Sequence, residues 1–238
     1  MEAAYDTKYT LEFALVVDSS ADMAPFMPRV KEFLRKMTEE VPRLCRSWER
    51  DVHQVRVRLI DFADYETEGE EAIRETRFFT LPEEEAEFTA ALDAIATDGR
   101  GGNGPKNGLE ALYTAMTSDW TPIRNSLCGR HVIVLVSNAC PLRLHERAAC
   151  AAYPREAMPK TVEELEDVWR EQDEEKTTKF STRGKRLCLI VPEDWNRNGH
   201  TWTSIDWELS AFTPWDAECS FLGDDTVRIL SEIIVIEN

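Results

Sequence analysis

Short apolar runs alternate along the chain with longer stretches in which apolar residues recur every three or four positions. The runs at residues 11–17, 132–136 and 187–191 are rich in Val, Ile and Leu, which is typical of buried strands. The segment 53–62 alternates apolar and polar residues, which predicts a strand with one buried face. On that face we expect Val55, Val57, Leu59 and Phe62. A further short strand is expected at residues 74–81.

Helical spacing predicts five helices, at residues 26–48, 83–95, 107–116, 162–172 and 226–236. For residues 226–236, which are rich in β-branched side chains, a strand is the alternative. Strands that alternate with helices indicate an α/β fold with three layers, in which helices cover both faces of a mostly parallel central sheet. The chain shows no internal repeat and no linker. We therefore expect one domain over residues 1–238, with its core from about residue 10 onward.

The net charge of the chain indicates which kinds of partner it can bind. Asp and Glu total 45 against 28 Lys and Arg, so the formal net charge is −17. Such a chain is unsuited to nucleic acid or to anionic membrane surfaces, and it favours cations and basic protein partners. The N-terminus lacks the pattern of a secretion signal, and the 6 cysteines form no CxxC pair. These features predict a cytoplasmic protein with reduced thiols.

Polar residues gather where three segments of the predicted sheet should meet. Residues 18–22, Asp-Ser-Ser-Ala-Asp, end the first strand, and residues 137–139, Ser-Asn-Ala, follow the strand at 132–136. A glycine-rich loop, residues 99–105, precedes a helix. Because ligands of such sheets bind at the carboxyl ends of the strands, we expect these segments to form one oxygen-lined site. We call the three segments the rim.

These motifs resemble the von Willebrand factor type A domain, and more narrowly its stand-alone bacterial and phage-defence-associated members. The family's metal-ion-dependent adhesion site combines Asp-x-Ser-x-Ser after the first strand, a Thr or Asp in a later glycine-rich loop, and an Asp after the fourth strand. The stretches "ALYTAMTSDW" and "RHVIVLVSNACP" are also similar to the bacterial subgroup. The resemblance runs from about residue 11 to the C-terminus and implies the three-layer fold.

The resemblance also implies a metal site, which this chain alters. The family's second serine is Asp22 here, its loop acid or threonine is Asn103, and its last aspartate is Asn138. All the substituted groups still offer oxygen, which hard divalent ions prefer. The implied direct ligands are Ser20, Asp22 and Asn103, with Asp18 and Asn138 acting through water. The implied ion is Mg²⁺, or Mn²⁺ or Ca²⁺, and the alternative is a metal-free site.

The function implied by the resemblance is a non-enzymatic interaction or adaptor module, in a bacterial defence or stress system. It would bind a protein partner whose Asp or Glu completes the metal coordination. One alternative is a Mg²⁺-dependent hydrolase or phosphatase that uses the carboxylates of Asp18 and Asp22. Another alternative is a structural subunit of a larger complex.

Other motifs carry more ordinary interpretations. Ser20 or Asp22 could simply cap the following helix. Residues 99–104 match GxGxxG, but they follow no strand, which argues against a dinucleotide site. The spacing of Cys140, His145 and Cys150 is unlike that of zinc sites. The basic residues 183–186 are expected in solvent. The tryptophans Trp195, Trp202, Trp207 and Trp215 are expected to pack in the core rather than form a partner patch.

Overall fold

The computed structural model describes residues 8–102, 104–122, 129–170, 184–193, 202–215 and 223–235. Within these residues, seven strands form one sheet in the order β3–β2–β1–β5–β6–β7, and β4 also pairs with β2. The strands are β1 (Tyr9–Asp18), β2 (Val52–Phe62), β3 (Ile73–Glu75), β4 (Phe79–Leu81), β5 (Gly129–Val136), β6 (Lys185–Val191) and β7 (Ser210–Pro214). Only β3 and β4 run antiparallel to their neighbour among these described strands, so the predicted mostly parallel sheet is confirmed.

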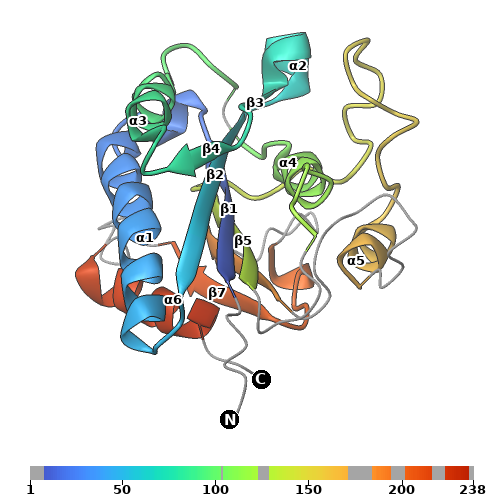
Figure 1. The fold of residues 1–238 in the computed structure, drawn as a ribbon. Coiled ribbons are helices and arrows are strands. Elements are labelled where there is room, and N and C mark those ends of the chain that lie inside the picture. Colours follow the sequence, from blue (N-terminus) through green and yellow to red (C-terminus); the bar gives the residue numbers. More distant parts are fainter. Residues whose placement is uncertain are drawn as a thin grey trace.

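Helices cover both faces of the sheet, as the sequence predicts. The α-helices are α1 (Met27–Ser47), α2 (Tyr65–Glu68), α3 (Glu85–Asp93), α4 (Gly108–Met116), α5 (Val162–Arg170) and α6 (Asp224–Val235). Short 3₁₀ helices span Ala21–Met23, Gly69–Ala72 and Trp202–Ser204. Figure 1 shows α1 and α3 on one side of the sheet and α4 and α5 on the other, which gives the three layers.

Strand β1 lies between β2 and β5 in the sheet, and its side chains contribute to the core on both faces of the sheet. Leu11, Phe13 and Leu15 pack in the cluster that contains α1 and α6, whereas Ala14 and Val16 pack in the cluster that contains α4 and α5. Side chains alternate between faces along a strand, so burial on both faces requires a continuous apolar run. The run at residues 11–17 has this composition.

The same alternation corrects one prediction for β2. Val55, Val57 and Leu59 share the α1 face as expected, but Phe62 lies in the α4 cluster with Ile60. Residue 62 is an odd number of positions from residues 55, 57 and 59. A period of two therefore turns its side chain to the other face.

The predicted single strand at residues 74–81 is also wrong, because it is two short strands. β3 pairs with residues 60–62 of β2, and β4 pairs with residues 55–57. Between them, the Thr76 amide donates to the Leu59 oxygen at 2.9 Å, whereas the Leu59 amide donates at 3.0 Å to the Thr76 hydroxyl instead of a backbone oxygen. Strand β7 was missed within the tryptophan-rich segment, where it extends the sheet by pairing with β6.

Burial settles two further predictions. Trp202 and Trp207 are buried and Trp215 is half-buried, as core packing predicts, while Trp195 lies outside the described residues. Lys185 and Arg186 are buried rather than solvated, because β6 carries them between neighbouring strands. In the described part of the chain, no helix has the length and apolar character needed to cross a membrane.

Candidate functional site

The ends of β1 and β5 bring two of the rim segments together. The strands pair in parallel, with Val17 opposite Val136, so the residues that follow them meet at one edge of the sheet. The Ser137 hydroxyl donates to Asp18 Oδ2 at 2.7 Å, and the Ser20 amide donates to Asp18 Oδ1 at 2.9 Å. The two carboxylate oxygens of Asp18 therefore link the segment after β1 to the segment after β5.

The glycine-rich loop closes onto these two segments. The Ala21 amide donates to the Arg100 oxygen at 2.8 Å, and the Lys106 amide donates to the Cys140 oxygen at 3.1 Å. Gly101 has φ +60, and a Cβ added to it would lie 3.2 Å from Ser20 Cβ. Glycine is therefore suited to this position both by its conformation and by the close approach of the loop. The three segments meet, as the sequence predicts.

The residues predicted to bind a metal differ in their burial and in their distance from the centre of the rim. Ser20 is fully buried and Asn138 is half-buried, and the Asn138 amide nitrogen donates to the backbone oxygen of Asp22 at 3.0 Å. The Asp22 side chain is exposed. Asn103 lies outside the described residues. The structure thus brings Asp18, Ser20 and Asn138 into one rim, with Asp22 at its outer side.

Burial dominates the electrostatics of Asp18. Burial raises the pKa of this carboxyl, while hydrogen bonds from Ser20 and Ser137 and the positive charge of Lys106 oppose the rise. The bond from Ser20 to Asp18 that has normal geometry is that of the backbone amide, and the Ser20 hydroxyl has no hydrogen-bond partner in the described structure. Its oxygen lone pairs consequently remain available.

Two buried oxygen atoms of the rim are candidate ligands for a cation. Ser20 Oγ and Asn138 Oδ1 both lack a hydrogen-bond partner among the described residues. Buried polar atoms without a partner are costly, and a hard cation or a water molecule would satisfy them. The described residues contain no group of three or more His, Cys, Asp or Glu side chains that could hold a metal ion. A metal at the rim would therefore need hydroxyl and amide oxygens in addition to the carboxylates of Asp18 and Asp22.

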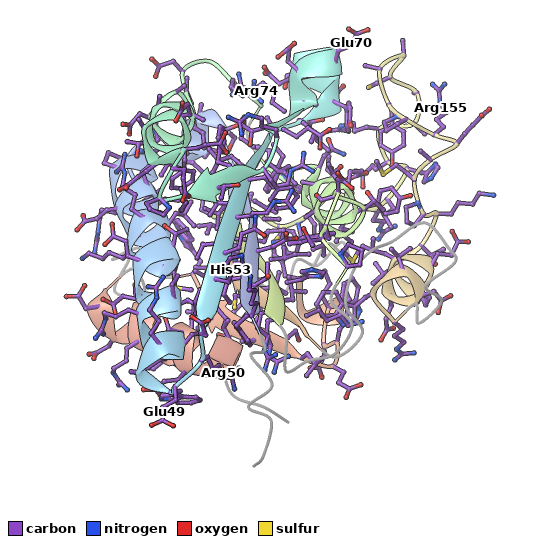
Figure 2. The ribbon with its side chains drawn as sticks, in the orientation of Figure 1. Glu49, Arg50, His53, Glu70, Arg74 and Arg155 are labelled. Carbon is purple, nitrogen blue, oxygen red and sulfur yellow. The ribbon has the colours of Figure 1, made fainter. Side chains whose placement is uncertain are left out.

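A cluster of charged residues that contacts the rim was not predicted from the sequence. Asp61, near the end of β2, accepts from the Ser19 hydroxyl at 2.8 Å and from Arg74 at 2.6 Å. Arg100 also pairs with Asp61 at 3.4 Å. Figure 2 shows Arg74 near β3, at the end of the molecule away from His53 and Arg50. The signal was an aspartate within an otherwise apolar strand end, which predicts a buried ion pair.

The alternative interpretations of the rim are weakened by the structure. The residue before α1 is Phe26, and it forms no side-chain cap, so neither Ser20 nor Asp22 caps that helix. Ser20 instead precedes the short 3₁₀ helix without a side-chain capping bond. Cys140 and Cys150 are half-buried and form no disulfide, and His145 packs edge-on against Tyr153 with 5.4 Å between ring centroids.

A buried carboxyl follows the glycine-rich loop and predicts a pH dependence of stability. Glu110 on α4 accepts from the Tyr153 hydroxyl at 2.9 Å, and burial raises its pKa to about 7. In the unfolded chain a glutamate titrates at about 4.3. Between these values the folded state binds the proton that the unfolded state has lost, so stability falls as pH rises through this window.

Glu110→Gln should therefore remove most of this fall, because the amide keeps the shape but carries no charge. We expect the variant to exceed the wild type in free energy of unfolding by about 2 kcal/mol at pH 8, and to gain little at pH 5. Urea denaturation at both pH values measures this. Equal pH profiles for the two proteins would contradict the prediction, and Glu40→Gln, on an exposed pair with Arg43, is the control.

Comparison with known proteins identifies the fold. No family model matches the sequence, and no curated protein matches it. Among solved structures, a von Willebrand factor type A protein from Catenulispora acidiphila aligns with 95% of this chain at 13% identity and a TM-score of 0.54. The pilus adhesin SpaC from Lactobacillus rhamnosus GG aligns with 95% of this chain, at 11% sequence identity and a TM-score of 0.55. Proximal thread matrix protein 1 from the mussel byssus, with a zinc-occupied metal-ion-dependent adhesion site motif, aligns with 96% at 12% identity and a TM-score of 0.50. The chain covers 43%, 31% and 47% of these three chains, less than half of each.

Proposed function

We propose that this chain, which has the von Willebrand factor type A fold, is a non-enzymatic module that binds a protein partner through the rim. The observation that carries the proposal is the pair of buried oxygens, Ser20 Oγ and Asn138 Oδ1, without partners in the described structure at the edge where three segments meet. Buried oxygen atoms that no described residue satisfies are suited to a ligand from outside. The bacterial defence or stress setting is part of the proposal and rests on the sequence resemblance.

A divalent cation is the group that these oxygens suit best. Ser20, Asp22 and Asn103 would hold it directly, and Asp18 would act through water, as the sequence resemblance implies. Asn138, to which the resemblance gives a role through water, is proposed here as a further direct ligand because its Oδ1 has no partner in the described structure. When bound, Mg²⁺, Mn²⁺ or Ca²⁺ would supply a coordination position for an Asp or Glu of the partner. The zinc-occupied motif of the mussel protein and the adhesin role named for SpaC support a binding function of this kind.

The environment of Asp18 argues against the hydrolase alternative. Its side chain is fully buried, and both oxygens accept hydrogen bonds from the chain itself. A carboxylate held in this way is poorly placed to attack a substrate, because a nucleophile must reach the reacting atom. We expect no hydrolysis of p-nitrophenyl phosphate with Mg²⁺. Turnover that disappears in Asp18→Asn would contradict the proposal and indicate an enzyme.

Affinity capture with rim variants tests the binding function directly. Tagged wild-type protein is incubated with lysate from the cells that express it, and retained proteins are compared with those held by Ser20→Ala and Asn138→Ala. We expect the specific partner to be lost, by roughly tenfold or more in recovered amount, because about 1.4 kcal/mol of binding energy is a factor of ten. Ser47→Ala, at the far end of α1 on an exposed residue, is the matched control. Retention of the same partners by all four proteins would show that the rim is not the binding surface.

A further inference from the structure

Lys106 is a buried cation next to the rim. It directly follows the glycine-rich loop, and it is 1% exposed. Its ammonium donates to the backbone oxygens of Gly102 and Gly104, the latter at 2.7 Å. A buried charge is costly unless opposite charge compensates it, and two carbonyl dipoles do so only in part. A carboxylate nearby is therefore expected to share this charge.

The end of the Lys106 side chain lies close to Ser20, two residues after Asp18. A Cβ added to Gly101 would lie 3.3 Å from Lys106 Cε and 3.2 Å from Ser20 Cβ, so the lysine end and the rim serine flank the same point. The charge of Lys106 also acts to lower the pKa of Asp18. Asp64 feels this charge as well, but it already forms a two-bond pair with Arg147 at 2.7 and 2.6 Å. Asp18 has no such arginine among its hydrogen-bond partners in the described structure.

We infer that Lys106 is a resident cation of this site, whose buried charge beside Ser20 keeps the affinity of the rim for divalent ions low. The inference deepens the proposed function and rests on it. A divalent ion at Ser20 would lie close to this ammonium-bearing side chain. Its repulsion from Lys106 scales with its double charge and is weakly screened in a buried site. The wild-type rim is thereby biased towards a metal-free or weakly bound state.

Replacing the charge of Lys106 should strengthen metal binding. We expect Lys106→Met and Lys106→Gln to bind Mn²⁺ at least roughly tenfold tighter than wild type, measured by calorimetric titration of the ion alone. Lys106→Arg keeps the positive charge and should bind as weakly as wild type. The matched control is Lys31→Met, since Lys31 likewise donates to two backbone oxygens, those of Asp93 and Ile95, but faces Asp93 rather than Asp18.

Two outcomes would overturn the inference. One is an Mn²⁺ affinity of folded Lys106→Gln that equals or falls below that of wild type, which would leave Lys106 a purely structural support of the loop. The other is a gain that survives in the double variant Lys106→Gln/Ser20→Ala, which would place the ion elsewhere. Thermal unfolding confirms that each variant is folded, and Lys106→Arg separates loss of charge from loss of packing. Partner capture by the rim is measured independently, so a failure of the proposed function is distinguishable from a failure of this inference.

Discussion

Arg56→Met should lower the free energy of unfolding by about 3–5 kcal/mol, because it leaves a buried carboxylate without its cation. Glu12 on β1 is 0% exposed, and Arg56 on β2 pairs with it at 2.5 Å. The Thr121 amide also donates to Glu12 at 2.8 Å, but it brings no charge. His131 cannot replace the arginine, since burial lowers its pKa to about 3 and it is neutral at ordinary pH.

Urea denaturation at pH 8 measures the effect of Arg56→Met. The control is Arg43→Met, whose partner Glu40 forms an ion pair on the surface, where such pairs contribute less than about 1 kcal/mol. The double variant Glu12→Gln/Arg56→Met should recover part of the loss, because no uncompensated charge remains. A loss for Arg56→Met no larger than that for Arg43→Met would show that Glu12 is compensated in another way.

Gly108→Ala should destabilise the protein by about 2–3 kcal/mol through overpacking between α4 and the buried Trp202. A Cβ at residue 108 would lie 2.5 Å from one ring carbon of Trp202 and 2.7 Å from the next. Trp202 is 1% exposed, so its rigid ring has little space into which to move. Its indole nitrogen also donates to the Ala139 oxygen at 2.8 Å, so a displaced ring would loosen the rim.

Thermal and urea unfolding measure the loss in Gly108→Ala, and partner capture reports the effect on the rim. Gly102→Ala is the matched control, because its added Cβ would meet only Thr67 Cγ2 at 3.8 Å, an ordinary contact. We expect Gly102→Ala to change stability by less than about 1 kcal/mol. Equal free energies of unfolding for the two variants would contradict the prediction and show that the Trp202 ring moves aside without destabilising the protein.

The core strands and helices could be predicted because their pattern is local. The runs at residues 11–17, 132–136 and 187–191 lie within β1, β5 and β6, and the predicted helix at 26–48 is α1 with small changes at its ends. The errors arose where local pattern was weak. Strand β7 is five residues long and its side chains are mostly half-buried or exposed, so pairing with β6 rather than composition makes it a strand.

The composition and hydrophobic periodicity of this chain were enough to establish an α/β sheet with polar segments at its carboxyl edge. Which atoms of those segments are satisfied was decided only when the chain folded. The contact between Ser137 and Asp18 spans 119 positions, and that between Asn138 and Asp22 spans 116. The position of Lys106 beside Ser20 likewise depends on the closure of the loop against β1. Hydrophobic periodicity reports which face of an element is buried, whereas the partner of a buried polar atom is set by contacts distant in sequence.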